Sequence, residues 1–503
     1  MDELAALSLA IFILIATSCV TILIALTRKP KTIAPTLPPG PRKLPILGNL
    51  HNLIGPTLPH RRLMELAVEH GPLMQLQLGE TSTVVVSSPE IAMEFLQTHD
   101  LNFATKPFLP SAATVLYNGR DIAFGPYGDY WRQMRKICVV ELLSPKRVRS
   151  FGPIRAQEVN ELVRSISMVA AGGGHEEAIN LTYRITCRTA FGEKAQNQEE
   201  AFSPVLEQIM KALGGLNLWD LFPSSNLVRL VSGTERKLKK LHLEADVILE
   251  QVLRDHVARR RTERVDGDLV DVLLNLSSKN HGLGFSITHL EIKAVILDMI
   301  LGGSDTSAVT VEWTMSELIK HPRVMEKVQK EVKEMFDGKR TVDEADLDEL
   351  HYLDMVIKES LRLHPPAPLI APRECRETTV INGYHIPAKT RIIVNAWAMK
   401  RDPRHWNEPT EFYPERFFDT SIDYNGQNFK FIPFGAGRRI YPGIPYGTVM
   451  VKLLLANLLY HFNWKLPYGI NLQDLDMSEE FGLTVKRKHN LFLIPIARHP
   501  QPS

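Results

Sequence analysis

The N-terminal stretch constrains this chain more than any other, because residues 5–27 carry no charged side chain and are rich in Ile, Leu and Ala. As a helix, such a run is long enough to cross a hydrocarbon core of roughly 30 Å. Acids precede it and cations follow it: Asp2, Glu3, Arg28, Lys29 and Lys31. Because cationic flanks stay on the cytosolic side, the sequence predicts a lumenal tail over residues 1–4, a single-pass transmembrane anchor over residues 5–27 and a cytosolic remainder. A cleaved signal peptide is disfavoured, since the run is too long and lacks a positive segment before it.

Residues 28–45 are basic and proline-rich, with prolines at positions 35, 38, 39 and 41. Proline fixes φ and removes a backbone donor, so we expect a stiff hinge here and no helix. No Gly/Ser-rich linker or internal repeat divides residues 46–503. The chain has 503 residues, of which 44% are hydrophobic, and this is enough for a large buried core. The sequence therefore predicts one large catalytic domain over residues 46–503.

Charge and cysteine content exclude some classes of protein. The net charge of +2 provides no strongly basic face, so we expect no nucleic-acid partner. The four cysteines show neither disulfide nor metal-ligand spacing, which fits a reducing compartment.

Local patterns predict a helix-rich α+β fold with small peripheral sheets. Helical periodicity covers residues 61–70 and ends at Gly71, and long helical patterns dominate residues 153–335 with a break at residues 172–174. Ser88 and Pro89 predict the capped start of another helix. Short strands are expected over these ranges: 73–78, 84–86, 379–386 and 492–496, the first two as an antiparallel pair.

The loop at residues 434–443 reads Phe-Gly-Ala-Gly-Arg-Arg-Ile-Tyr-Pro-Gly. It matches the pattern Phe-x-x-Gly-x-Arg-x-Cys-x-Gly at every fixed position except the cysteine, which Tyr441 replaces. This pattern resembles the haem-binding loop of the cytochromes P450. The resemblance implies a haem b site at which Tyr441 occupies the metal-ligand position and Phe434 opens the cofactor-binding loop.

Tyr441 changes the chemistry that the loop predicts. A thiolate pushes electron density onto iron and favours O–O cleavage, whereas tyrosinate is a harder oxygen ligand. Tyrosine is also longer than cysteine, so it cannot reach iron from the same backbone position unless the loop moves back. The cysteines of the chain lie far from the loop in sequence: Cys19, Cys138, Cys187 and Cys375. Tyr441 is thus either an altered residue in an ordinary enzyme or a sign that haem chemistry has been lost from a retained fold.

A long apolar helix is expected over residues 298–320, interrupted by Gly302-Gly303-Ser304-Asp305-Thr306-Ser307. Paired glycines weaken a helix interior and mark kinks. The stretch resembles the oxygen-activation motif of the same family. By that resemblance, Asp305 supplies protons and Thr306 stabilises the iron-bound peroxide, so both are candidate catalytic residues.

Three further groups of residues match the family. Trp131, Arg135, Arg373 and Arg439 resemble its propionate-binding residues. Glu359, Arg362 and Arg416 resemble its structural salt-bridge triad. Apolar segments at 108–124 and 368–371 resemble its substrate-facing regions, which makes these residues candidates for substrate binding: Leu109, Val115, Leu116, Leu369 and Ile370.

The wording of residues 121–128 and 433–435 resembles the plant microsomal (A-type) branch of the family. This implies a monooxygenase in the endoplasmic reticulum membrane that acts on a small lipophilic terpenoid, alkaloid or phenylpropanoid and receives electrons from NADPH–cytochrome P450 reductase. An apolar loop over residues 213–222, with Trp219, is expected at the bilayer surface, and the run 259–261 is a candidate reductase contact. Two alternatives remain open: a redox-neutral cyclase or isomerase in the same fold, and a non-catalytic membrane scaffold.

Overall fold

The computed structural model describes residues 36–172, 181–192, 196–214, 217–260, 267–278, 286–339 and 342–498. The predicted anchor and most of the predicted break at residues 172–174 lie outside these ranges. Among the described residues, one helix is long and apolar enough to cross a membrane, His289–Lys320, but 78% of its most apolar window is buried inside the protein. Such burial is typical of a core helix.

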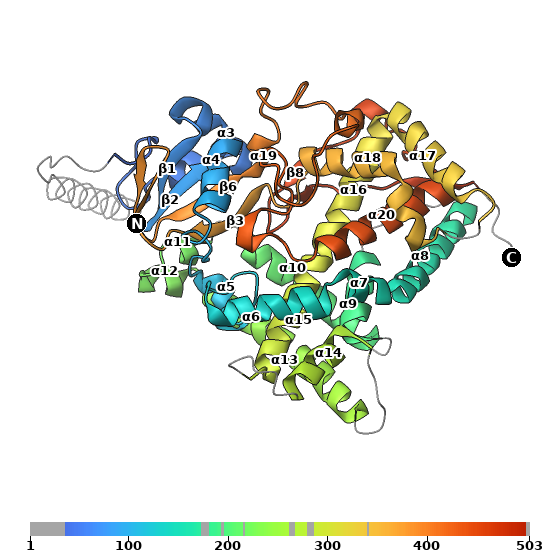
Figure 1. The fold of residues 1–503 in the computed structure, drawn as a ribbon, viewed down its shortest axis with the longest axis horizontal. Coiled ribbons are helices and arrows are strands. Elements are labelled where there is room, and N and C mark those ends of the chain that lie inside the picture. The colour runs from blue at the N-terminus through green and yellow to red at the C-terminus, as the bar shows by residue number, and fades with distance from the viewer. Residues whose placement is uncertain are drawn as a thin grey trace, which may run out of the picture.

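A four-stranded sheet forms one end of the molecule, in the order β1-β2-β6-β3 (Figure 1). Its strands are β1 (Leu73–Leu78), β2 (Thr81–Val86), β6 (Arg391–Asn395) and β3 (Leu369–Glu374). β1 and β2 pair antiparallel, as the sequence predicts, and β2 pairs parallel with β6. Between Ile370 and Arg373 the register of β3 against β6 shifts. Val84, Val85 and Val86 are all buried, which explains why this β-branched run lies inside the sheet and not at its edge.

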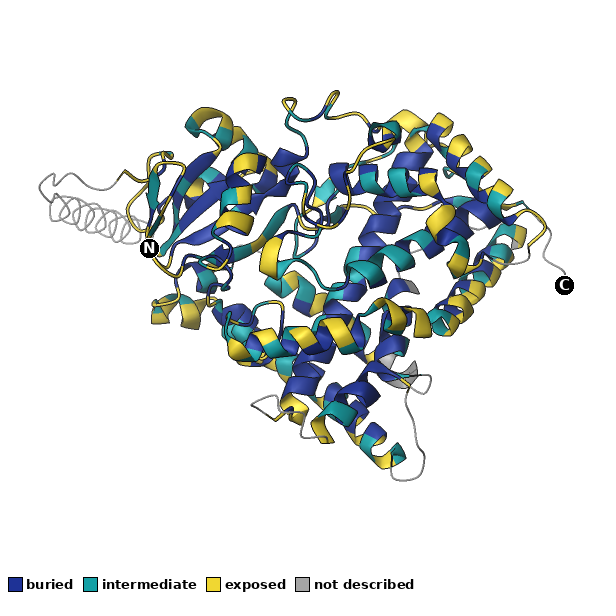
Figure 2. Ribbon diagram, viewed as in Figure 1, coloured by how far each residue is buried: buried dark blue, intermediate teal, exposed yellow. Residues whose placement is uncertain are grey.

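Helices form the rest of the body and surround two consecutive buried helices, α15 and α16 (Figures 1 and 2). The α-helices are α2 (Leu50–Leu53), α3 (Pro59–His70), α4 (Pro89–Met93), α5 (Pro110–Val115), α6 (Asp129–Ile137), α7 (Pro145–Ser150), α8 (Gly152–Gly172), α9 (Leu181–Phe191), α10 (Gln196–Leu213), α11 (Leu218–Leu221), α12 (Asn226–Val231), α13 (Thr234–Arg259), α14 (Leu269–Ser278), α15 (His289–Gly303), α16 (Asp305–Lys320), α17 (Pro322–Phe336), α18 (His351–Leu363), α19 (Ala396–Met399) and α20 (Ile444–His461). Short 3-10 or π segments cover Glu94–Thr98, Tyr117–Gly119, Cys138–Leu142, Glu344–Glu349, Pro414–Phe417, Gly437–Arg439 and Leu472–Asp474.

Three two-stranded antiparallel sheets complete the described part of the structure. They are β4 (Thr379–Ile381) with β5 (Tyr384–Ile386), β7 (Phe462–Lys465) with β10 (Ile494–Ala497), and β8 (Glu479–Glu480) with β9 (Lys486–Arg487). The strands expected near 379–386 and 492–496 are therefore present. The helix expected at 61–70 is α3, which ends before Gly71 (φ 95°), and Ser88 caps α4 by accepting the Ile91 N–H.

The central helix pair breaks where its sequence predicts, but it begins at His289 and not at residue 298 as expected. Thr288 and Glu291 form a capping box at the start of α15, so the first backbone donors are satisfied. The helix is interrupted at Ser304, between the paired glycines and Asp305. The kink lies beside the loop at residues 434–443, which leads into α20.

That loop is held by close backbone contacts. Gly437 has φ 66°, and a Cβ there would lie 2.1 Å from the Leu96 carbonyl oxygen, so no larger residue fits. Asp100 accepts the backbone N–H of Arg438 at 2.7 Å. α20 then packs along α16, which fixes the loop opposite the kink.

Candidate active site

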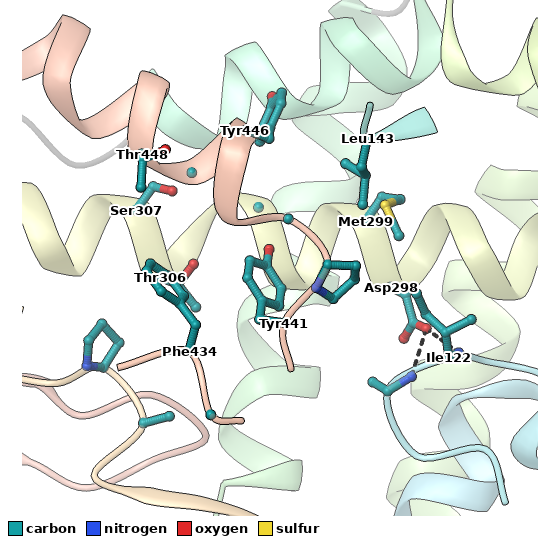
Figure 3. Close-up of a pocket in the computed structure, with 18 of the residues that line it drawn as sticks. Ile122, Leu143, Asp298, Met299, Thr306, Ser307, Phe434, Tyr441, Tyr446 and Thr448 are labelled. Carbon is teal, nitrogen blue, oxygen red and sulfur yellow. Dashed lines mark hydrogen bonds between the residues drawn. The ribbon is translucent and has the colours of Figure 1, made fainter. Parts of the chain in front are cut away.

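A cavity of about 280 Å³ lies between the α15–α16 kink, the loop at residues 434–443 and the start of α20 (Figure 3). We call it the central cavity. Its lining is mostly apolar and joins segments far apart in sequence, including Ile122, Met299, Thr306, Ile370, Phe434 and Tyr441. The two residues expected at the haem loop and the expected catalytic threonine therefore meet in one cavity.

Tyr441 points from the loop toward the end of α15. A Cβ added to Gly302 would lie 3.1 Å from the Tyr441 hydroxyl oxygen, so the phenol rests on bare helix backbone. The ring stacks on Phe434 at 5.9 Å between centroids, with planes 16° apart. The Tyr441 N–H donates to the Phe434 carbonyl oxygen at 3.0 Å. Burial raises the pKa of Tyr441 above its usual value, so its hydroxyl is neutral at physiological pH.

Four cations line one edge of the central cavity, and we call them the cation cluster: Lys106, Arg135, Arg373 and Arg439. The Arg439 guanidinium lies 3.9 Å from the Trp131 ring centroid and donates to the carbonyl oxygens of Ala104 and Gly125 at 2.7 and 2.6 Å. Arg135 lies over the same ring at 5.4 Å and donates to the Ile440 carbonyl oxygen. The structure thus brings Trp131 together with both arginines.

The remaining cations approach from β3 and from the segment before α5. Arg373 donates to Asp100 at 2.7 Å and to the Ala436 carbonyl oxygen at 2.6 Å. Lys106 donates its ammonium to the Ala371 carbonyl oxygen at 2.8 Å. Sequence reasoning missed Lys106. The available signal was that Lys106 is the one charged residue in the otherwise uncharged stretch 101–119.

The cation cluster carries more positive charge than its neighbours neutralise. Burial, followed by the charges of Arg373 and Arg135, lowers the pKa of Arg439 to about 9. Burial also lowers the pKa of Lys106 well below its usual value, and the charges of Arg373 and Arg439 reinforce this effect. Asp100 pairs with Arg373 at 2.7 Å and is shared with Arg438, whose side chain lies 3.8 Å away. A ligand with carboxylates would relieve this mutual repulsion.

Asp305 and Thr306 face different cavities. The Thr306 hydroxyl donates to the Gly302 carbonyl oxygen at 2.7 Å and lines the central cavity. The Asp305 carboxylate accepts the Thr484 hydroxyl in a second cavity of about 360 Å³, which also contains Lys486. Burial raises the pKa of Asp305. Consecutive helical residues differ by about 100° around the helix axis. Asp305 and Thr306 therefore line separate cavities.

Asp298 is a further site residue that sequence reasoning did not select. Its carboxylate lines the central cavity and accepts the N–H groups of Ile122 and Ala123 at 2.6 and 3.2 Å (Figure 3). Burial and the nearby Asp121 raise the pKa of Asp298 well above its usual value. A buried carboxyl group with a raised pKa therefore faces the cavity.

Of the residues expected to bind substrate, Ile370 lines the central cavity. Val115 and Leu116 are buried in the main hydrophobic core, and Leu109 packs against that core. Leu369 packs against the small core beneath β1 and β2. The helix α5 turns its apolar face toward α13, which explains why its residues serve packing here.

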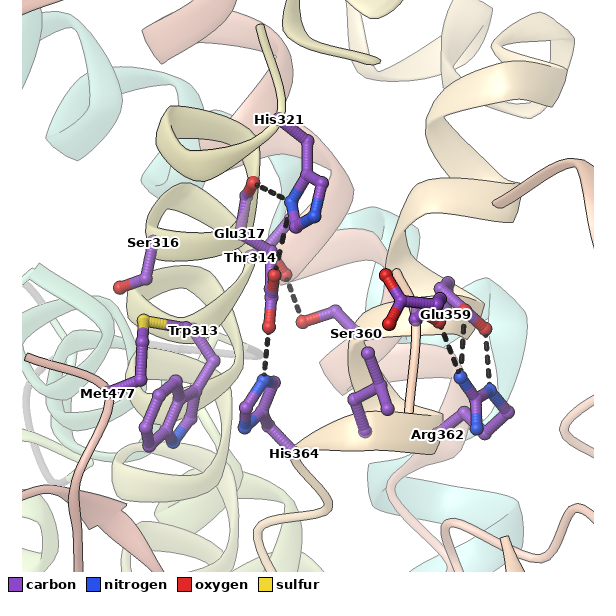
Figure 4. Close-up of polar contacts among 12 residues, drawn as sticks. Trp313, Thr314, Ser316, Glu317, His321, Glu359, Ser360, Arg362, His364 and Met477 are labelled. Carbon is purple, nitrogen blue, oxygen red and sulfur yellow. Dashed lines mark hydrogen bonds and ion pairs between the residues drawn. The ribbon is translucent and has the colours of Figure 1, made fainter. Parts of the chain in front are cut away.

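The predicted triad is assembled in the core beneath the site. Glu359 accepts two hydrogen bonds from Arg362, at 2.7 and 2.9 Å, and one from Arg416 at 3.0 Å (Figure 4). Glu359 and Arg362 are fully buried. Arg362 also donates to three carbonyl oxygens, those of Lys400, Pro409 and Glu411.

Two segments are predicted to lie at interaction surfaces: residues 259–261 as a reductase contact and residues 213–222 at the bilayer surface. Arg259 and Arg260 pair with Asp268 and Asp271 of the same chain, so these two cations are engaged internally, while position 261 lies outside the described residues. Trp219 lies on α11 and is buried, whereas the neighbouring Leu218 is exposed.

The chain is similar to known proteins in both sequence and structure. The family model "Cytochrome P450" matches residues 38–493. The chain is 49% identical over 469 residues to desmethyl-deoxy-podophyllotoxin synthase from Sinopodophyllum hexandrum, covering 92% of each chain. It is 48% identical over 476 residues to premnaspirodiene oxygenase from Hyoscyamus muticus, covering 92% of this chain and 93% of that one. A zebrafish cytochrome P450 solved with abiraterone superposes with a TM-score of 0.71 at 25% identity, covering 88% of this chain and all of that one.

The fold and the site define a haem-monooxygenase architecture. This chain belongs to the cytochrome P450 family. Membership implies a haem iron cofactor and electrons from NADPH that arrive through a reductase. Its similarity to plant oxygenases and hydroxylases supports a monooxygenase of specialised metabolism.

The edge of the central cavity fits haem, but its centre does not fit in this conformation. The cation cluster can neutralise the two haem carboxylates, which would otherwise be costly to bury. At the ligand position, however, the Tyr441 ring extends from the loop to Gly302 and fills the gap that a macrocycle must enter. The described cysteines provide no substitute ligand, because Cys138, Cys187 and Cys375 do not line the cavity.

Proposed function

We propose that this protein is a membrane-bound monooxygenase-family enzyme whose substrate is a small lipophilic plant metabolite, and that Tyr441 limits its oxidative turnover. The observation that carries the proposal is the cation cluster. Four cations placed at the edge of an apolar cavity are expensive to maintain without an anionic partner, and Trp131 orients two of them. This arrangement supports a site that binds haem through its carboxylates.

The lining of the central cavity supports a lipophilic substrate. Met299, Ile370 and Leu361 contribute apolar surface, and Thr306 contributes a hydroxyl whose direction is fixed by Gly302. An apolar cavity with few oriented polar groups is typical of sites for small hydrophobic molecules. The names of two relatives, a desmethyl-deoxy-podophyllotoxin synthase and a premnaspirodiene oxygenase, support a lignan- or terpenoid-like substrate.

Exposed apolar side chains support membrane attachment near the start of the described chain. On α12, Leu227, Leu230 and Val231 are each more than 70% exposed, and Ile46 before α2 is 69% exposed. α12 lies at the same end of the molecule as the N-terminal part of the described chain (Figure 1). We propose that this end faces the endoplasmic reticulum membrane and that residues 5–27 anchor it, with the catalytic domain in the cytosol.

The electron donor that we propose is NADPH–cytochrome P450 reductase on the same membrane. The spectrum of the reduced carbon monoxide complex tests the haem site directly. The protein as it stands should lack the thiolate-type Soret band, whereas Tyr441→Cys should show it and oxidise an apolar substrate in the presence of NADPH and reductase. A thiolate band in the unaltered protein would contradict the role given to Tyr441. A thiolate-ligated Tyr441→Cys protein that stays inert on a broad terpenoid and phenolic panel would overturn the monooxygenase proposal.

A redox-neutral conversion is a second candidate, because Asp298 presents to the central cavity a carboxyl group whose pKa burial raises. Such an acid can protonate an alkene or epoxide during a cyclisation or isomerisation. Product formation without NADPH and reductase, abolished by Asp298→Asn, would favour this reaction. Strict dependence on NADPH would exclude it.

A further inference from the structure

Tyr441 occupies the iron-ligand position of the family pattern, yet its contacts are those of a packed core side chain. Its hydroxyl and ring lie against Gly302 on one wall and against Gly443 on the other, and the ring also stacks on Phe434. A Cβ added to Gly443 would lie 2.7 Å from the Tyr441 ring and hydroxyl, so this glycine leaves the space that the ring uses. Both walls of the central cavity are therefore in contact with one side chain.

The direction of the side chain matters because the macrocycle and the phenol need the same gap. The loop at residues 434–443 forms one wall and the end of α15 forms the other. A ligand of iron must end short of the macrocycle plane, on the side of the loop. The Tyr441 hydroxyl instead reaches the opposite wall at Gly302. A flat ring cannot lie between two walls while a side chain connects them.

We propose that Tyr441 is a space-filling residue that competes with haem for the central cavity, and that it is not the ligand of the iron. The inference rests on the proposed function only in taking this cavity as the haem site. Haem enters after the phenol leaves its contacts with Gly302 and Phe434. The haem-free chain is correspondingly better packed than a relative with a small residue at this position, because the ring fills the space between the walls.

Two substitutions separate a space-filling residue from a ligand. Tyr441→Phe keeps the ring and removes the ligating oxygen, whereas Tyr441→Ala removes both. Competition predicts that the phenylalanine variant binds haem as weakly as the parent, while the alanine variant binds it roughly tenfold to a hundredfold more tightly, since no aromatic ring must be displaced. Ligation predicts the reverse, with both variants weaker than the parent.

The measurement is a haem titration of the full-length, haem-free protein in detergent, followed by Soret absorbance. Tyr460→Ala is the matched control. Tyr460 is a buried tyrosine near the other end of α20 that donates its hydroxyl to the carbonyl oxygens of Phe336 and Lys339, away from the central cavity. Its loss should leave the haem dissociation constant unchanged. Tighter binding by the alanine variant alone supports the proposal, and an alanine variant no tighter than the parent overturns it.

A second measurement needs no haem. Gly302→Ala places a methyl 3.1 Å from the Tyr441 hydroxyl, so it should lower the melting temperature of the haem-free protein when Tyr441 is present. In the Tyr441→Ala background the same change should be neutral or stabilising, because alanine favours helix over glycine. If Gly302→Ala changes the melting temperature equally in both backgrounds, the contact between Gly302 and Tyr441 does not exist in solution.

The two failures are distinguishable. If Tyr441→Cys binds haem but Tyr441→Ala gains nothing over the parent, the competition is wrong and the proposed function stands. If neither variant binds haem, the cavity is no haem site, and the proposed function and the competition fail together.

Discussion

The guanidinium carbon of Arg439 lies 3.9 Å from the ring centroid of Trp131, well within the distance of about 6 Å at which an aromatic ring attracts a cation. Arg439 also donates to the carbonyl oxygens of Ala104 and Gly125. These contacts fix the guanidinium at the edge of the central cavity before any ligand arrives. Preorganisation of this kind reduces the cost of binding an anion.

Arg439→Gln should therefore weaken haem binding by about tenfold or more, because a hydrogen bond to a charged group contributes about 1.5–3 kcal/mol. The change is best made in the Tyr441→Cys background and followed by haem titration. Arg438→Gln is the matched control, since Arg438 is the neighbouring residue and its side chain is 52% exposed. Equal losses in the two variants would show that overall charge, and not the position of Arg439, governs binding.

Glu359→Gln should lower the free energy of unfolding by about 3–5 kcal/mol. The change leaves the buried Arg362 and its neighbour Arg416 without their carboxylate, and an uncompensated buried charge is costly. Urea unfolding monitored by circular dichroism measures the effect.

The control for this experiment is Glu65→Gln. Glu65 pairs with Arg62 at the same three-residue spacing on α3, but both side chains are exposed. Exposed pairs contribute about 0–1 kcal/mol. If Glu359→Gln lowers the free energy of unfolding no more than Glu65→Gln does, water must enter the core and solvate the arginines of the triad.

Motifs predicted the fold class and the edge of the site, because strand alternation, the capped α4 and the residues Trp131 and Arg439 follow short local patterns. The direction of Tyr441 could not be predicted, since it depends on Gly302 of a helix distant in sequence. Lys106 was missed because a single lysine before a proline matches no pattern. Val115 and Leu116 were assigned to substrate because an apolar helix does not reveal which neighbour covers it, and here α13 does.

Stability should fall as pH rises through the range in which His321 loses its proton. The hydrogen bond to Glu317 is the main cause that raises the pKa of His321. A histidine whose pKa is raised in the folded state stabilises the protein fully at pH values below its unfolded-state pKa of about 6.5. This stabilisation is lost as the pH rises through the folded-state pKa. Burial alone would raise the pKa of Glu317, but hydrogen bonds from His321 and His364 lower it to about 2 (Figure 4).

Glu317 therefore stays ionised above about pH 5. Between about pH 6 and pH 8 the pH dependence has contributions from His321 and from His256, whose pKa burial alone would lower but the hydrogen bond to Asp268 raises. Glu317→Gln should remove the His321 contribution, as measured by urea unfolding at the two pH values. His351→Gln, at an exposed histidine, should preserve it. An unchanged pH slope in the Glu317 variant would assign the effect to other groups.

The orientation of the chain in the membrane gives the last prediction. Charge asymmetry around residues 5–27 predicts that the catalytic domain lies in the cytosol. Two glycosylation sequons lie in that domain, Asn180-Leu181-Thr182 and Asn275-Leu276-Ser277. The glycosyl transferase acts in the lumen, so a cytosolic domain carries no glycan at either asparagine. We expect no mass change on glycosidase treatment, and digestion of the domain by protease added outside sealed microsomes. Full protection from protease, or a shift on deglycosylation, would place the domain in the lumen, where a cytosolic reductase could not reach it and the monooxygenase proposal would fail.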